Sequence, residues 1–371
     1  MKKTYIDTAM ERIAPDLILK GGNVVDVFSG RVIKADVIIK DGIICGVGSY
    51  SGENEQDVSG KYVMPGFIDS HVHIESSMTQ PSEYAKAVMP HGITTVIADP
   101  HEITNVCGED GLEFMLKSAK NIPLDVNLML PSCVPATPFE HTGANLDAKT
   151  TQKLAPKFFG IGEMMNYPGI VSGDDETLGK LCLDIIDGHA SLLSGHELDA
   201  YTSAGIKTDH ECSVVEEMTE KISKGMYILL REGTLSLDVA KLIKGVTPYT
   251  LRRCAFCTDD RFVGEIIRDG SIDHCIRKAV SLGLNNIDAI IMATLNACEM
   301  YGMKNKGAIA PSYVADIVVA DDLNLSSISQ VYKNGKLVCE NGTALFESKT
   351  VDNSNVTNTV HPTKISAEYF K

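Results

Sequence analysis

Hydrophobic positions change their spacing along the chain and divide it into three regions. From residue 16 to 62, short runs of alternating apolar and polar residues are broken by turns such as Asp41-Gly42. Residues 315–338 repeat this pattern, with Asn334-Gly335 as a turn of the same kind. Such alternation between Gly-containing turns predicts half-buried strands joined as hairpins. Between about residues 63 and 305, apolar runs alternate with helix-like stretches, which indicates parallel βα units.

The central region contains eight short apolar runs that we predict to be strands: Phe67–Asp69, Thr94–Ala98, Val126–Leu130, Phe159–Gly162, Ile185–Asp187, Gly205–Thr208, Met226–Leu230 and Cys254–Thr258. Helix-like stretches lie between them, at Pro81–Met89, Asp110–Ala119, Ser194–Ala204 and Ser213–Lys224. Eight such units in this length predict an α/β fold of the (β/α)8 TIM-like barrel type. A doubly wound open sheet is the alternative.

The two β-rich ends are each too short to form a comfortable core alone. We therefore expect them to pair as one small β-sandwich domain beside the barrel. The predicted divisions are residues 1–62 and 308–347 for the two parts of that domain, 63–307 for the barrel, and 348–371 for a tail. The tail shows no clear period and reads either as a linker or as the start of a further domain.

Charge and cysteine usage narrow the class of protein. Thirty-four Lys and Arg against 49 Asp and Glu give a net charge of −15, which repels nucleic-acid phosphates and anionic membranes. We expect neither as a partner, while a small neutral base is compatible with this charge. Ten scattered cysteines include one C-x-x-C pair, Cys254 and Cys257, so we expect neither a disulfide framework nor a zinc ribbon. No signal-peptide core or membrane-spanning stretch is present in the sequence, which predicts a cytoplasmic protein.

Polar residues with acid, base or ligand chemistry follow the predicted strands, and in a barrel the carboxyl ends of all strands meet at one rim. In strand order they are His71 and His73; Asp99, His101 and Glu102; Ser132 and Cys133; Glu163; Asp187 and His189; Asp209, His210 and Glu211; Arg231 and Glu232; and Asp259, Asp260 and Arg261. A lone histidine there is more often structural, and a lone acidic residue often caps a helix. Joint occurrence at strands one, four, five, six and eight instead favours a metal centre. The remaining histidines are expected to be structural or exposed: His91, His141, His196 and His274.

The ligand types indicate the chemistry to expect. Alternation in a strand sends His71 and His73 to the same side, where both imidazoles can reach one ion. Four histidines and two carboxylates are too many for one tetrahedral zinc ion and suit two ions that share a bridge, which Glu163 or Asp259 can supply. Two adjacent cations acidify a water between them, and a carboxylate beside that water, best placed at Asp259, accepts its proton. The predicted chemistry is hydrolysis.

Several motifs resemble one known family. Pro65-Gly-Phe-Ile-Asp-Ser-His-Val-His73 is similar to the first-strand signature of the amidohydrolase superfamily of metal-dependent hydrolases. More narrowly, the chain resembles adenine deaminases of the bacterial type in the motifs His71-Val-His-Ile-Glu-Ser-Ser-Met78, Val96-Ile-Ala-Asp-Pro-His-Glu-Ile103, Asp187-Gly-His189, Asp209-His-Glu-Cys212, Arg231-Glu-Gly233, Thr258-Asp-Asp-Arg261 and Met292-Ala-Thr-Leu-Asn-Ala297. The resemblance runs from about residue 15 to 345.

This resemblance implies a binuclear metal centre and the hydrolytic deamination of adenine to hypoxanthine and ammonia, a reaction of adenine catabolism and purine salvage. One ion would be held by His71 and His73 and the other by His189 and His210, with Glu163 as the bridge. The metals implied are two divalent ions, Mn²⁺ in the first place, with Fe²⁺ or Zn²⁺ as alternatives. Adenine is the implied small-molecule partner, and we expect a homo-oligomer.

The resemblance also implies roles in proton transfer. Asp259 would be both ligand and proton shuttle. The purine must gain a proton at a ring nitrogen, and Glu163 or His101 would supply it. His101 lies on the predicted rim, although no partner stands near it at ligand spacing in the sequence.

Two departures from the family pattern leave alternatives open. The residue after His189 is usually proline in the family, whereas this chain continues with Ala190. Adenine deaminases of this type also carry a further C-terminal domain, and this chain ends at Lys371. The alternatives are another amidohydrolase, acting on a cyclic amide or an N-acetyl sugar, and a truncated paralogue that binds metal without turnover. A lysine in place of Glu163 would have favoured the cyclic amidases.

Overall fold

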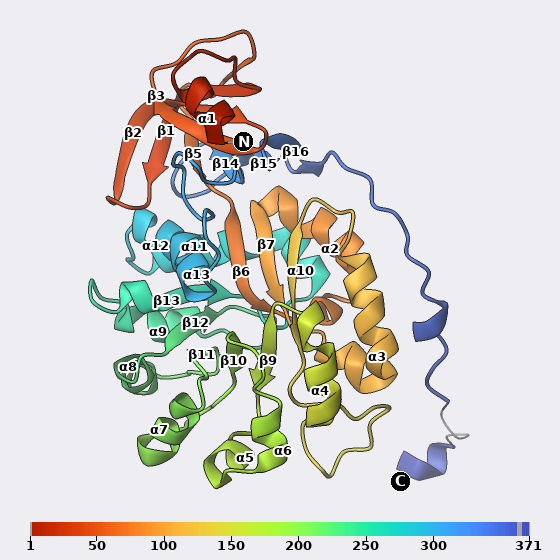
Figure 1. Ribbon diagram of the computed structural model, residues 1–371. Coiled ribbons are helices and arrows are strands. Elements are labelled where there is room, and N and C mark those ends of the chain that lie inside the picture. Colours follow the sequence, from red (N-terminus) through yellow and green to blue (C-terminus); the bar gives the residue numbers. More distant parts are fainter. Residues whose placement is uncertain (1, 362–365, 371) are drawn as a thin grey trace.

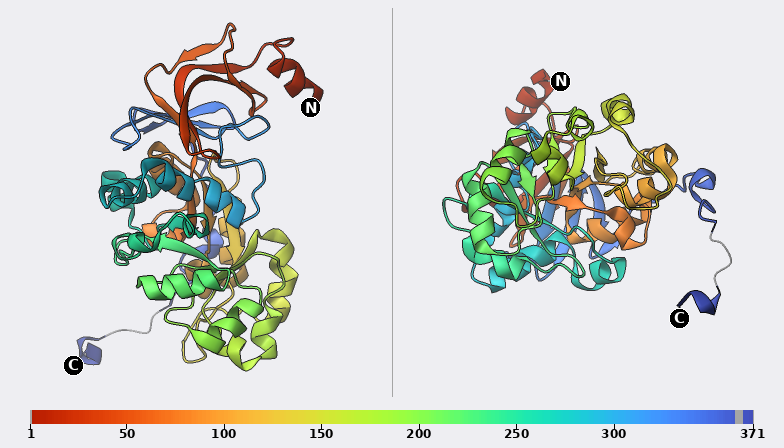
Figure 2. Two further views of the ribbon diagram at one scale, coloured as in Figure 1. Left: turned by 90° about the vertical axis from the view of Figure 1, so that its left-hand side faces the viewer. Right: turned by 90° about the horizontal axis from the view of Figure 1, so that it is seen from below.

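The computed structural model describes residues 2–361 and 366–370 (Figure 1). A β sheet built from both ends of the chain lies at one end of a barrel of strands and helices, and a C-terminal tail runs along the outside of the barrel (Figures 1 and 2). The tail touches α3 (His101–Ser118), where the Cys107 thiol lies 3.9 Å from the carbonyl oxygen of Val356. Among the residues described, no helix combines the length and apolarity needed to cross a membrane.

Strands from the two chain ends share one nine-stranded sheet, in the order β17-β16-β15-β14-β5-β1-β2-β3 with β4 paired to β1. The seam is the antiparallel pair of β5 and β14, in which Val63 faces Val319. These pairings describe a single sheet and do not confirm the expected sandwich. The strands are β1 (Leu17–Asp26), β2 (Arg31–Lys40), β3 (Ile43–Gly48), β4 (Glu55–Asp57), β5 (Tyr62–Pro65), β14 (Ile317–Ala320), β15 (Ile328–Lys333), β16 (Lys336–Glu340) and β17 (Thr343–Ala344).

The barrel strands are eight and parallel, and they follow one another in chain order: β6 (Phe67–Val72), β7 (Ile93–Ala98), β8 (Asp125–Leu130), β9 (Gly160–Met164), β10 (Ile186–Gly188), β11 (Thr208–Asp209), β12 (Tyr227–Arg231) and β13 (Cys254–Cys257). Backbone pairing runs from β6 to β10 and from β11 to β13. The ring closes beyond β13, where the Asp259 N–H donates to the carbonyl oxygen of His71 at 2.9 Å. The fold is therefore TIM-like, and the eight expected strands are all present.

One strand differs from its expected position. We predicted a strand over Gly205–Thr208, whereas β11 comprises only Thr208 and Asp209. Gly205 has φ +96° and its N–H bonds back to Thr202, so it belongs to the end of helix α7 (Gly195–Ser203). Its conformation suits a glycine that terminates a helix and not a strand.

Helices cover the barrel, while the first helix, α1 (Lys2–Ala9), packs against β2 and β3 of the sheet (Figure 1) and was not predicted by the sequence pattern. Helix α3 starts at His101, nine residues before the expected stretch, and bends at Gly108, whose φ is +58°. This places His101 in the first turn after β7. The remaining helices are α2 (Pro81–Val88), α4 (Ala148–Leu154), α5 (Tyr167–Ser172), α6 (Asp175–Gly179), α7 (Gly195–Ser203), α8 (Val215–Ser223), α9 (Val239–Leu242), α10 (Val263–Asp269), α11 (Ile272–Ser281), α12 (Asn286–Met292) and α13 (Leu295–Met300).

One continuous apolar core joins the barrel to the sheet. Phe67 at the start of β6, Met89 after α2 and Val318 on β14 belong to the same buried cluster. Gly92 lies among them, and a Cβ there would come within 2.8 Å of the Phe67 ring. The amino end of β6 is thus fixed by packing, which sets the position of the histidines at its other end.

Candidate metal centre

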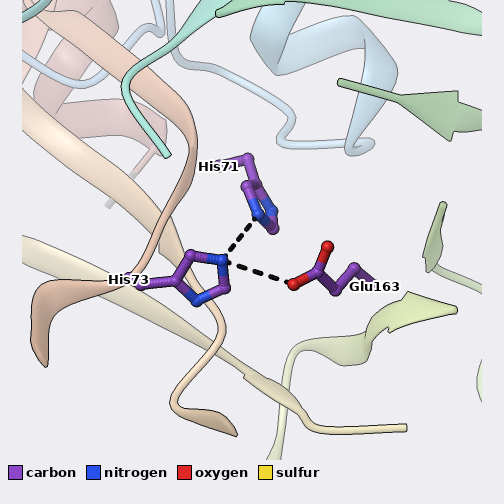
Figure 3. Close-up of side chains that lie close together, drawn as sticks. All are labelled: His71, His73 and Glu163. Atoms are coloured by element: carbon purple, nitrogen blue, oxygen red, sulfur yellow. Dashed lines mark hydrogen bonds and ion pairs between the residues drawn. The ribbon is translucent and has the colours of Figure 1, made fainter. Parts of the chain in front are cut away.

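The His71-Val-His73 motif ends β6, a strand that is buried along its whole length. The Nε2 atoms of His71 and His73 lie 3.1 Å apart, so the two rings converge as strand alternation predicted (Figure 3). The backbone on both sides of this pair is bonded to Asp259: the His71 carbonyl accepts from its N–H, and the His73 N–H donates to its carbonyl at 3.3 Å. The two rings are 1% and 3% exposed.

The carboxylate of Glu163, at the end of β9, faces two groups of histidines with its two oxygens. Oε1 lies 3.4 Å from Nε2 of His73, the contact drawn in Figure 3. Oε2 lies 2.6 Å from Nδ1 of His189 and 3.2 Å from Nε2 of His210. The Glu163 carboxylate therefore lies between the histidines of β6 and those that follow β10 and β11, with one oxygen facing each group.

Asp259 completes the set from the loop after β13. Its Oδ1 lies 3.2 Å from Nε2 of His73 and 3.6 Å from Nε2 of His71. Its Oδ2 accepts from Nη1 of Arg231 at 2.9 Å. Asp259 has φ +57°, a left-handed conformation that aspartate adopts more readily than most residues. One oxygen therefore faces the histidines while the other is held by a guanidinium.

The remaining two histidines lie across the rim from β6. The His210 ring stacks on the His71 ring with centroids 4.1 Å apart. His189 meets His210 edge to face at 5.3 Å, and its side chain is 31% exposed. The structure thus brings all six expected ligands together, with His189 on the solvent side.

Burial and neighbouring groups set the protonation of this cluster. Burial raises the pKa of Glu163, but hydrogen bonds from His101 and His189 lower it by more, to well below its usual range. Asp259 shows the same balance, with burial opposed by hydrogen bonds from the β6 histidines, and its pKa is lowered. Burial lowers the pKa of His71, while the nearby carboxylates of Asp187 and Asp259 raise it to about 10. Ionised carboxylates and converging imidazole nitrogens in a buried site form a donor set that fits divalent cations.

Groups behind the histidines orient the rings. Nδ1 of His73 lies 2.8 Å from the carbonyl oxygen of Asp99, which leaves Nε2 for the centre. Nδ1 of His71 is buried without a hydrogen-bond partner, 3.9 Å from Oδ2 of Asp187. A hydrogen-bonded carbonyl such as that of Asp99 fixes the tautomer of a histidine that binds metal.

His101 has a partner that sequence spacing did not reveal. Its Nδ1 lies 3.2 Å from Oε1 of Glu163, and its ring centroid is 4.4 Å from that of His73. Nε2 lies 3.6 Å from Oε1 of Glu102. His101 therefore belongs to the edge of the centre.

A second group at the rim had no role in the sequence interpretation. The Arg231 guanidinium is 9% exposed and forms ion pairs with Asp259, Glu211 and Asp238. The Nε atom donates to Oδ2 of Asp238 at 3.1 Å. The motif Arg231-Glu-Gly233 marked this residue in the sequence, but its three acidic partners come from separate loops and only the fold assembles them.

A hollow of 560 Å³ lies between the loops after β8 and β9. Ser132 forms part of its wall and donates from Oγ to the Glu163 carbonyl at 2.6 Å. Met164, the next residue after Glu163, forms another part. The volume is within the range of small-molecule pockets.

The chain belongs to the amidohydrolase family, whose model matches residues 62–338. The matched residues include the whole barrel and strands that both ends of the chain contribute to the sheet, from β5 to part of β16. Membership in this family and the clustered histidine and carboxylate donors together identify the rim as a divalent metal centre.

Curated relatives are similar over most of this chain. "Adenine deaminase 2" of Desulfotalea psychrophila is 50% identical over 357 residues, which cover 94% of this chain and 62% of the relative. "Adenine deaminase" of Clostridium acetobutylicum is 50% identical over 372 residues, covering 98% and 65%. The chain therefore spans less than two thirds of the length of these relatives. A solved structure of D-aminoacylase, whose description names a binuclear metal center, has a TM-score of 0.63 at 17% identity and covers 90% of this chain and 98% of its own.

Proposed function

We propose that this chain carries the catalytic barrel of an adenine deaminase, which hydrolyses adenine to hypoxanthine and ammonia at a binuclear metal centre. The observation that carries the proposal is the division of the Glu163 carboxylate between two histidine groups. It is supported by relatives named adenine deaminase at 50% identity. His71 and His73 would hold one ion, and His189 and His210 the other.

When bound, two divalent cations supply an acidified water and polarise the electrophile. The residues of the chain supply the proton transfers. Oδ1 of Asp259 accepts the proton of the attacking water as the water oxygen bonds to C6 of adenine, and returns a proton to the amino group, which leaves as ammonia when the C6–N bond breaks. Glu163 or His101 supplies the proton that a purine ring nitrogen needs and regains one from the C6 hydroxyl as this group becomes the carbonyl of hypoxanthine. The hollow between the loops after β8 and β9 has the volume of a small-molecule pocket, and its wall includes Met164, the residue after Glu163.

The metal, the assembly and the domain plan are part of the same proposal. Mn²⁺ comes first, with Fe²⁺ or Zn²⁺ as alternatives, because mixed nitrogen and oxygen donors accept all three. The partner is adenine, and neither nucleic acid nor membrane is expected because the net charge is −15. We assign residues 63–307 to the barrel, 1–62 and 308–347 to the small β domain and 348–371 to a tail, in a cytoplasmic homo-oligomer.

The deciding experiment incubates the manganese-loaded protein with adenine and follows hypoxanthine and ammonia. Formation of both in equal amounts is expected. A panel of cyclic amides and N-acetyl sugars runs in parallel, and hydrolysis of a panel member with no turnover of adenine would make the chain another kind of amidohydrolase. Two bound ions without turnover of either class would instead indicate a binding paralogue.

A further inference from the structure

Lys221 on α8 is a buried cation that the proposed chemistry does not use. Its side chain is fully buried, and its Nζ donates to three acceptors: the Ala190 carbonyl at 2.6 Å, Oε1 of Glu217 at 2.7 Å and Oδ2 of Asp209 at 2.9 Å. Burial lowers the pKa of Lys221, but its carboxylate neighbours raise it to about 12, so it stays charged. A buried ammonium with every N–H used is costly to rearrange.

Two of these acceptors are chain neighbours of candidate ligands. Ala190 follows His189, and Asp209 precedes His210. Oδ1 of Asp209 also accepts from the Ala190 N–H at 2.8 Å, a bond that a proline at position 190 could not donate. One ammonium thus links the backbone beside one histidine to the side chain beside the other.

Glu217 also bonds to the backbone of both loops, the one after His189 and the one after His210. Its Oε1 accepts from the Leu192 N–H at 2.7 Å, and its Oε2 accepts from the Ser213 N–H at 3.3 Å. We call Lys221, Asp209 and Glu217 the Lys221 brace. The brace fastens the segment after His189 and the segment after His210 to the same helix.

The strand pairings of the described residues do not join β10 to β11, the two strands that precede His189 and His210. β10 has three residues and β11 has two, and the strand pairings place them in different sheets. By contrast, β6 pairs with β7, and its histidines are flanked by backbone bonds to Asp259. We name His71 and His73 the backbone-held pair, and His189 and His210 the brace-held pair.

We propose that Lys221 is a positioning residue that keeps His189 and His210 in register for one of the two cations, so that its loss weakens that cation selectively. The inference rests on the binuclear centre proposed above. It predicts unequal effects on the two ions, because none of the brace's hydrogen bonds or ion pairs among the described residues goes to His71 or His73. A lysine that only supported folding would affect both ions together.

The test replaces Lys221 with methionine, which fills a similar space without charge. Metal per chain is measured by mass spectrometry after manganese loading and desalting, and both affinities are measured by calorimetric titration. The native protein should bind two ions. K221M should keep one at native affinity and bind the second at least tenfold more weakly. Lys153→Met is the matched control, because Lys153 pairs with Glu109 on the surface and its side chain is 67% exposed.

Two outcomes would overturn the inference: folded K221M that retains both affinities, or folded K221M that loses both equally. If K221M does not fold, Glu217→Gln decides in the same way, since it keeps the Lys221–Asp209 pair and weakens only one arm of the brace. His189→Ala serves as the one-ion reference. If the native protein binds two ions but does not deaminate adenine, the proposed function is wrong, whereas this inference about Lys221 is unaffected.

Discussion

The two histidine pairs of the centre are held by different means. The backbone-held pair ends a buried strand whose neighbours are bonded through the main chain, whereas the brace-held pair follows strands of three and two residues and depends on buried ions. Main-chain bonds tolerate changes of side chain, while a buried ion network fails when one member is removed. The two halves should therefore respond unequally to substitution, and Glu163 is the group that touches both.

The largest effect is expected at Glu163. Glu163→Gln replaces one oxygen with an amide and removes the charge that serves both pairs. Turnover should fall by about 10⁴-fold, the upper range for loss of a group that moves protons, and both ions should bind more weakly. Steady-state assays and metal analysis check this. Glu197→Gln, at an exposed position on α7, is the control and should behave as the native protein. A Glu163→Gln variant that loses only one ion would contradict the bridging role.

Asp259→Asn should have the next largest effect. Asparagine keeps the shape but accepts a proton poorly, so kcat should fall by about 10²- to 10⁴-fold while KM changes little. The ion at the backbone-held pair should bind more weakly, because Oδ1 of Asp259 faces both histidines of that pair. Asp184→Asn, exposed and far along the chain, is the control. A native rate in Asp259→Asn would remove Asp259 from the proton path.

Arg231→Met tests the guanidinium behind Asp259. Loss of a group that orients a ligand typically costs about 10- to 100-fold, and we expect kcat to fall in that range. Arg231→Lys should recover only part of it, because an ammonium cannot contact Asp259, Glu211 and Asp238 in one plane. The exposed Arg268→Met is the control. Equal rates for both Arg231 variants and the native enzyme would show that Asp259 needs no support from Arg231.

The sequence predicted which side chains lie together at the rim better than it predicted the groups that support them. Strand alternation alone predicted that His71 and His73 point the same way. The rule that the carboxyl ends of barrel strands meet at one rim predicted that Glu163, His189 and Asp259 lie near them. These are local or topological rules that act on residues at strand ends. The unexpected α1 and the short β11 show the limits of apolar pattern at helix and strand boundaries.

The supports depend on distant partners, which no local pattern encodes. The Lys221 Nζ meets the carbonyl of Ala190, 31 residues away, and Arg231 pairs with Asp259, 28 residues away. Glu217 and Lys221 stand four apart on a helix, a spacing that is common in exposed pairs. Only burial, which the fold creates, distinguishes this pair from an ordinary surface one.

Chelation of the metal should change stability only modestly, but it separates the two pairs most directly. Ligands that bind only the folded state stabilise it by about 2.7 kcal/mol at a hundred times Kd, so the metal-free protein should melt a few degrees lower. Hydrogen exchange should locate the loss: amides of residues 190–195 and 211–213 should exchange faster without metal, while those of β6 stay protected by their main-chain partners. K221M should show the faster exchange even with metal present. An equal increase in amide exchange in β6 and in these loops would mean that main-chain pairing does not hold His71 and His73 in place, and that the metal orders both pairs to the same degree.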